Sequence, residues 1–162
     1  MGFTEVVYKI RSEGFPLCQF SETHSDVRAI VHTTSWDEDT RHHRALVTLV
    51  GPDHKIQQLS EALGQVYDRK EVVGSAKERL ILKVSARLDT LKKTSNPAAF
   101  ALDYFGDQAA FEPSLVKDGY LHARVLIVGK VDLADLLAHY ERGVKEARWT
   151  DFKLIRIDDF DP

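Results

Sequence analysis

Three side chains around one predicted β-hairpin turn are the best placed for chemistry, namely two histidines and a tryptophan. His32 and Trp36 lie toward the end of one β-branched run, and His43 stands at the start of the next. With a loop over residues 36–41, Thr34 would face His43, so His32 and His43 would be diagonal neighbours on one face of the hairpin. Such neighbours can share a ligand, and an aromatic ring at the loop mouth can form the floor of a cleft. The sequence therefore predicts a ligand-binding site at His32, Trp36 and His43.

The sequence indicates neither a metal site nor a catalytic centre. The remaining histidines lie on other predicted elements, and none stands in a His-x-x-x-His or His-Glu-x-x-His spacing. Because a third metal ligand is lacking, ordinary strand histidines are the favoured interpretation. No acid, base and nucleophile converge along the chain, so we predict no catalytic residue, and the sequence leaves the cofactor unknown.

Opposite charges meet at the same hairpin. Residues 41–44 read Arg-His-His-Arg, and residues 37–39 read Asp-Glu-Asp. Across a tight loop these charges would neutralise each other, which favours a solvated, internally paired hairpin over an anion site.

The overall composition limits the partners and the compartment. Lys and Arg number 22 against 25 Asp and Glu, a formal net charge of −3. Because binding to a phosphate backbone needs a surplus of positive charge, we expect no direct contact with nucleic acid. Cys18 is the single cysteine, which excludes a disulfide framework and is typical of a reducing compartment. With no predicted signal peptide or membrane span, we expect a soluble cytoplasmic protein.

Strand and helix patterns alternate along the whole chain. Apolar alternation and turn residues predict strands, and apolar residues three and four apart predict helices. The predicted strands cover residues 3–11, 27–36, 42–50, 71–75, 79–88, 109–116, 120–128 and 152–157, and the predicted helices cover residues 15–24, 53–67, 97–104 and 132–144.

The predicted order of elements is the same in both halves of the chain. Each half follows the order strand, helix, strand, strand, helix, strand, which is the ferredoxin-like order. Residues 45–51 (ALVTLVG) are echoed by residues 123–129 (ARVLIVG). We therefore predict an α+β fold of two tandem ferredoxin-like units, residues 1–76 and 77–162, each with an antiparallel sheet. The open faces of the two sheets would meet each other or a second subunit.

The chain also resembles a known family. Phe15-Pro16-Leu17, followed by Asp26-Val27-Arg28 and a strand ending in a polar loop, is similar to the N-terminal regulatory domain of archaeal bacterio-opsin-activator-type transcription regulators. The stretch from Gly106 to Ile157 is similar to the region that precedes the DNA-binding segment in that family. Those regulators continue into a helix-turn-helix, and this sequence stops at Pro162 without one. The resemblance implies a regulatory role and supplies no ligand-contacting residue.

Three functions are compatible with these observations. The first is a regulatory or sensory domain of a transcription regulator that binds a small molecule or forms a homodimer. The second is a small α+β-barrel enzyme acting on an aromatic or haem-like substrate, with a histidine as base or ligand. The third is a module that binds a partner protein. The scaffold alone does not decide among them, since one fold hosts many functions.

Overall fold

The computed structural model describes residues 2–129, 131–146 and 148–160. Within these residues the chain forms nine strands, five α helices and one short 3-10 turn. The strands are β1 (Phe3–Ser12), β2 (Arg28–Asp37), β3 (His42–Val50), β4 (Arg69–Ala76), β5 (Arg79–Arg87), β6 (Ala109–Phe111), β7 (Ser114–Lys117), β8 (Tyr120–Val128) and β9 (Trp149–Phe160). The helices are α1 (Pro16–Thr23), α2 (Asp53–Leu63), α3 (Leu88–Lys93), α4 (Ala98–Phe105) and α5 (Leu133–Glu146).

All nine strands belong to one antiparallel sheet. Its order is β4-β5-β3-β2-β7-β8-β1-β9, and β6 pairs with β8 beside β7. The join between the two sides of the sheet is the pairing of β2 with β7, where Ile30 faces Leu115. The prediction of two tandem ferredoxin-like units with separate sheets is therefore wrong.

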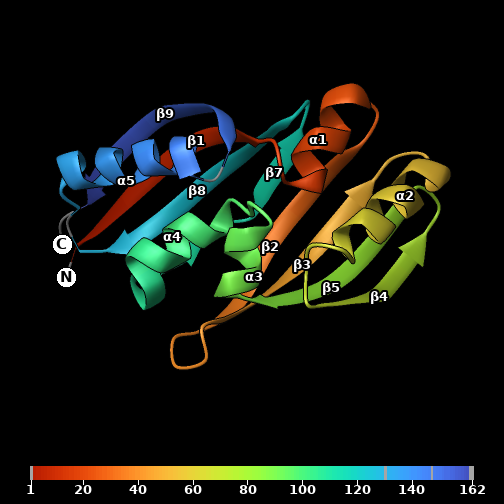
Figure 1. Cartoon of the computed structure of the whole chain (residues 1–162), viewed down its shortest axis with the longest axis horizontal. Coiled ribbons are helices and arrows are strands. Elements are labelled where there is room, and N and C mark those ends of the chain that lie inside the picture. Colours follow the sequence, from red (N-terminus) through yellow and green to blue (C-terminus); the bar gives the residue numbers. More distant parts are fainter. Residues whose placement is uncertain (1, 130, 147, 161–162) are drawn as a thin grey trace.

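The two strands that begin the predicted halves have exchanged places. In a ferredoxin-like unit the first strand lies between the third and the fourth, which would be β1 between β3 and β4; here β5 occupies that position, and β1 lies between β8 and β9 (Figure 1). Both strands carry an unbroken apolar inner row, including Val6 and Ile10 in β1 and Leu82 and Val84 in β5. Because side-chain alternation sets the face of a strand and not its neighbours, either strand suits either slot. We call the strands β4, β5, β3 and β2 the β5 half, and β7, β8, β1 and β9 the β1 half.

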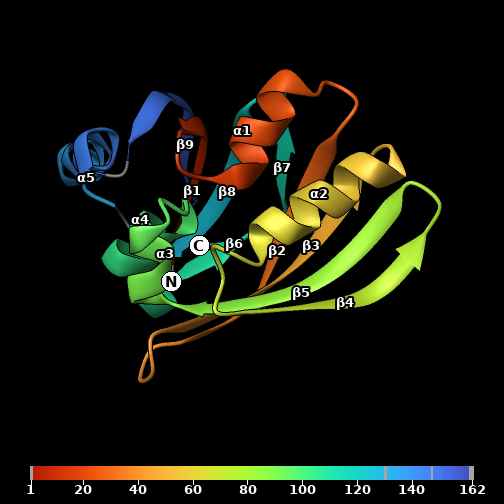
Figure 2. The same cartoon turned by 45° about the vertical axis from the view of Figure 1, so that its right-hand side comes forward.

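The helices cover one face of the sheet. Figures 1 and 2 show α1 to α5 on the same side, α2 over the β5 half and α5 over the β1 half. Leu59 and Leu63 of α2 and Leu136 and Tyr140 of α5 are buried against the inner residues of the strands. None of the helices in the described segments is long and apolar enough to cross a membrane.

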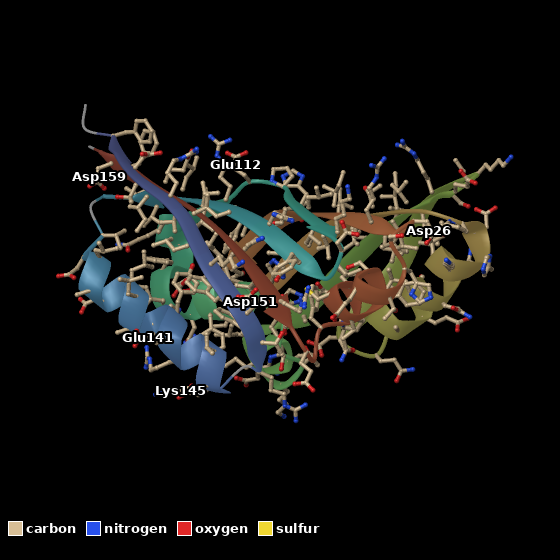
Figure 3. All side chains as sticks on the ribbon, turned by 90° about the horizontal axis from the view of Figure 1, so that it is seen from above. Asp26, Glu112, Glu141, Lys145, Asp151 and Asp159 are labelled. Carbon is tan, nitrogen blue, oxygen red and sulfur yellow. The ribbon has the colours of Figure 1, made fainter. Side chains whose placement is uncertain are left out.

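The other face of the sheet carries no second layer within the described residues. Figure 3 shows the strands with the helices on one side and Glu112 on the other. Apolar side chains on this side are exposed, Ile30 by 42%, Ile81 by 40% and Leu115 by 38%. The two predicted open faces therefore do not pack on each other, because the halves lie side by side in one sheet. We call this surface the open face.

Candidate functional site

The register of the β2–β3 hairpin separates the predicted site residues. Trp36 faces His43, while His32 faces Leu46, because an irregularity between Thr33 and Ser35 adds one residue to β2. The extra residue is a β-bulge, and beyond it the pairing shifts by one place. His43 is buried on the inner face, whereas His32 is exposed on the open face. The prediction that His32 and His43 share a face is therefore wrong.

His43 is a neutral core histidine. Its Nε2 lies 2.9 Å from the hydroxyl oxygen of Thr33, and its buried Nδ1 has no hydrogen-bond partner among the described residues. Burial and, to a smaller extent, the neighbouring charge of His42 together lower the pKa of His43 to about 4. A histidine with this pKa is uncharged at neutral pH.

A small cavity lies beside His43 under the β2–β7 junction. Its volume is about 30 Å³, and its polar lining includes Thr33, Tyr67, Asn96 and Ser114. The Asn96 amide donates to the Tyr67 hydroxyl at 3.0 Å, and burial raises the pKa of Tyr67 to about 12. One water needs about 10 to 15 Å³ of such space, so the cavity holds roughly two waters and has no room for an aromatic or haem-like substrate.

Trp36 lies at an acidic loop rather than at a cleft shared with His32. Its indole nitrogen donates to Oε2 of Glu38 at 2.6 Å. The surface around it is lined by Ser35, Asp37, Glu38, Asp39, Arg44 and Asp107. The expected neutralisation within this hairpin is also wrong for Arg41, which pairs with Asp103 of α4 at 2.7 Å.

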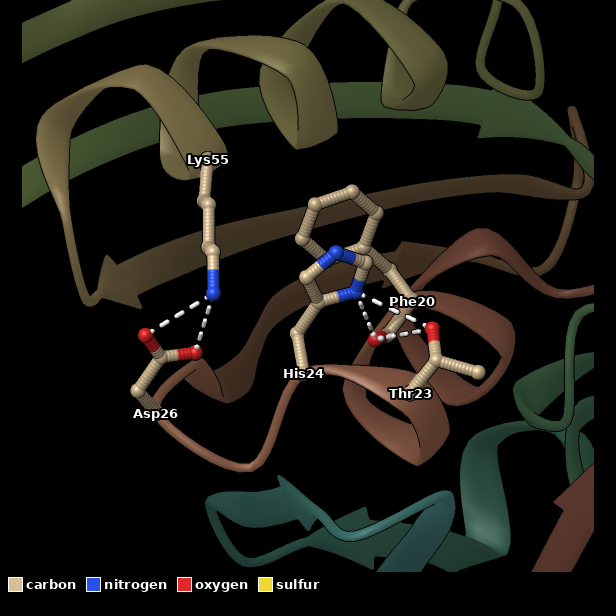
Figure 4. Close-up of polar contacts among 5 residues, drawn as sticks. All are labelled: Phe20, Thr23, His24, Asp26 and Lys55. Carbon is tan, nitrogen blue, oxygen red and sulfur yellow. Dashed lines mark hydrogen bonds and ion pairs between the residues drawn. The ribbon is translucent and has the colours of Figure 1, made fainter.

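His24 serves local structure. Its ring packs at the C-terminal end of α1. Nδ1 lies 2.9 Å from the carbonyl oxygen of Phe20, and the ring stacks on the Phe20 ring with 4.0 Å between centroids (Figure 4). Close to it, the Lys55 ammonium donates to both carboxylate oxygens of Asp26 at 2.9 Å, and this bond lowers the pKa of Asp26. This pair joins α2 to the loop after α1.

Basic side chains are concentrated on the open face of the sheet. Strand alternation and register place the following basic residues there: Arg28, Arg44, Arg69, Arg79, Lys83 and Arg87 on the β5 half, and Lys9, Arg11, Lys117, Arg124, Lys153 and Arg156 on the β1 half. Fewer acidic residues share the face, namely Glu5, Asp37, Glu71, Glu112, Asp151 and Asp158. Twelve basic groups thus stand against six acidic ones, although the whole chain has a formal charge of −3.

In the β1 half most of these basic groups already have partners. Arg124 Nη2 and Arg156 Nη2 each lie 2.6 Å from a carboxylate oxygen of Glu5, and the hydrogen bonds from Arg156 and Arg124 lower the pKa of Glu5. Lys9 and Arg11 lie over the Tyr120 ring, 4.5 Å and 4.3 Å from its centroid.

In the β5 half three cations surround a depression of about 560 Å³ on the open face. Arg44, Arg69 and Lys83 line it from the open face, together with Ser85, Asp68 and Glu71, and Lys70 and Val84 complete the lining. No ion pair joins these three cations to a carboxylate within the segments that the structure describes. This depression was not predicted, although residues 79–87 alternate apolar residues with Arg, Lys and Ser, a pattern that indicates a basic strand face.

Comparisons with known proteins leave the chain without an assigned family. No model of a known protein family matches the sequence, and no curated protein is significantly similar to it.

Proposed function

We propose that this chain is a cytoplasmic regulatory module that senses a small anionic molecule on the open face of its sheet. The observation that carries the proposal is the group of unpaired cations around the depression in the β5 half. The resemblance to the regulatory domains of bacterio-opsin-activator-type regulators supports the regulatory part of the proposal. The charge sorting supports an anionic ligand.

The charge of the open face also bears on how the chain would assemble. Two copies packed face to face would bring two cationic surfaces together, and like charges in contact disfavour association. Ligand binding therefore explains this surface better than the face-to-face homodimer that the sequence suggested.

The buried side of the sheet does not favour the enzyme alternative. Its cavity beside His43 is too small for the substrates considered, and the polar side chains around it are a neutral histidine, two tyrosines, an asparagine, a threonine and a serine. General acid–base catalysis works best with a group whose pKa is close to the working pH. The lowered pKa of His43 and the raised pKa of Tyr67 both lie far from neutrality.

A thermal-shift screen tests the proposal. The purified chain is melted with small phosphates, polycarboxylates and sulfated compounds, and with neutral analogues of the same size, at constant ionic strength. An anion at ten times its Kd should stabilise the fold by about 1.4 kcal/mol, which raises the Tm by about 3 to 5 °C for a chain of this size. If no anion shifts the Tm more than its neutral analogue does, the proposal is wrong.

A further inference from the structure

We infer that the depression in the β5 half binds the phosphate group of a small phosphate monoester, held by Arg44, Ser85 and Arg69. These three residues are called the anion row. The inference rests on the proposed function and adds the ligand class and the residues that would hold it.

The sheet register places the anion row in one straight line. Arg69 of β4 faces Ser85 of β5, and Ser85 faces Arg44 of β3. Neighbouring strands are about 4.8 Å apart, so the two arginine Cα atoms lie roughly 10 Å apart with the serine midway between them. Since Val84 and Ala86 are buried on the inner face, Ser85 points to the open face. The guanidinium groups of Arg44 and Arg69 can therefore both reach a ligand group that lies over the Ser85 hydroxyl.

The β1 half shows that such an arrangement can hold a single oxyanion. There Arg124 of β8 and Arg156 of β9 both face Val7 of β1, in a line of the same kind. Both guanidinium groups converge on the carboxylate of Glu5, which is only 4% exposed. Glu5 stands two residues before Val7 and so lies on the same face of β1. In the β1 half the oxyanion that the two arginines bind is therefore a side chain of the protein, the carboxylate of Glu5.

In the β5 half the central strand supplies no acid. The neighbours of Ser85 on the same face of β5 are Lys83 and Arg87, so a third cation stands where an internal anion would have to be. Among the lining carboxylates, Asp68 already accepts bonds from the Arg87 backbone amide and the Thr90 hydroxyl, both at 2.8 Å. Glu71, opposite Lys83, is the other acid at the depression. The anion row thus lacks an internal partner among the described residues and suits an external one.

A phosphate monoester fits the donors and the space. It offers three terminal oxygens and close to two negative charges, which match two arginine forks and one hydroxyl donor, with Lys83 nearby. A depression of about 560 Å³ lies within the range of small-molecule sites and leaves room for the part of the molecule that carries the phosphate. A carboxylate has two oxygens and one charge, so it would use the anion row less fully.

Calorimetric titration with defined probes tests this inference. The whole chain is titrated with ribose 5-phosphate and inorganic phosphate in a phosphate-free buffer at constant ionic strength. We expect one site per chain, and we expect Arg44→Gln with Arg69→Gln to weaken the Kd by roughly tenfold or more. Ser85→Ala should weaken it by a few fold. The matched control is Arg28→Gln with Arg79→Gln, which removes the same charge from the same face outside the depression and should change the Kd by less than about twofold.

Other results of the titration would contradict the anion row, the phosphate ligand or the proposed function. Equal losses in both double variants would show a general charge effect and would overturn the anion row as the site. If a tricarboxylate such as citrate binds while both phosphates do not, the proposed function survives and this inference fails. If no anion binds, both fail. A single-stranded oligonucleotide that binds while both phosphates do not would also overturn the inference, and it would assign the open face to nucleic acid instead.

Discussion

The two halves of the open face carry the same number of basic side chains but use them differently. In the β1 half Arg124 and Arg156 are satisfied by Glu5, and Lys9 and Arg11 by the Tyr120 ring. In the β5 half Arg44, Arg69 and Lys83 line a depression and have no such partner among the described residues. The difference shows that the number of basic side chains on a face does not say which of them have partners, because that depends on whether the register brings an internal acid to each cation.

The largest expected effect concerns the strand on which the β1 half depends. Removing residues 1–12 deletes β1 and leaves β8 and β9 without the strand that joins them. It also removes the buried side chains of Val6, Tyr8 and Ile10 from the core. We expect loss of cooperative unfolding, measured by circular dichroism during a thermal melt. A peptide of residues 1–12 added in trans should restore the transition, and a truncated chain that melts normally without it would contradict the exchanged topology.

Acid should act on the inner face of the sheet through two buried histidines whose pKa values burial lowers, His139 of α5 in the β1 half and, with the larger shift, His43 under the β5 half. The pKa of His43 is about 4 in the folded chain, below its ordinary value of 6.5, so the unfolded chain binds the proton more readily. Stability from this group is complete above pH 6.5 and is lost as the pH falls from about 6.5 toward 4. The loss amounts to about 3 kcal/mol at most. Urea unfolding at pH 7 and pH 4.5 measures it, and His43→Gln should flatten the dependence. An unchanged pH slope in this variant would show that His43 is not the group responsible.

Glu5→Gln should make the β1 half resemble the β5 half. The substitution keeps the shape of the side chain and releases Arg124 from its carboxylate, and it is combined with Asp158→Asn because Arg156 also pairs with Asp158 at 2.6 Å. We expect a lower Tm and, in the calorimetric titration, a second weak phosphate site beside the first. A variant that still binds phosphate at one site only would show that two arginines across a central strand do not suffice to bind an external anion.

The smallest expected effect comes from Glu71, the acid opposite Lys83. Its negative charge opposes the binding of an anion in the depression. Glu71→Gln should therefore tighten phosphate binding by about two- to fivefold, the range expected for one exposed charge. The same titration measures it, with Glu112→Gln on the β1 half as the control for a general charge effect. Weaker binding in Glu71→Gln would place the ligand elsewhere on the face.

Local structure was predictable because each element carries its own pattern. Residues 79–88 alternate strictly, and the structure forms β5 over Arg79–Arg87. Asp53 begins the predicted helix 53–67 and also begins α2, but its carboxylate caps no helix amide and instead accepts from the backbone amide of Glu78, which joins α2 to the β4–β5 turn. Helix α3 was missed because it is short, with Leu88 and Leu91 as its only buried residues.

The assembly of the sheet was not predictable in the same way. Nothing in the sequence of β1 or β5 says which strands will flank it, because both have the same alternation and a similar length. The bulge at Thr34 was equally hidden, and it breaks the single register of β2 against β3 that would have put His32 on the same face as His43. The basic face of residues 79–87 was visible in the sequence. The proposed anion site also needs Arg44 and Arg69, and only the strand register shows that these two residues lie beside Ser85.

The position of β1 affects how the chain folds during its synthesis. This strand leaves the ribosome first, while its partners β8 and β9 are made last. At about 5 to 20 residues per second, β1 waits roughly 5 to 30 s for its neighbours. The β5 half can pair its strands during that interval, because β2 to β5 follow one another along the chain. The apolar row of Val6, Tyr8 and Ile10 therefore stays exposed on the nascent chain, which makes this segment the one that a chaperone would need to hold.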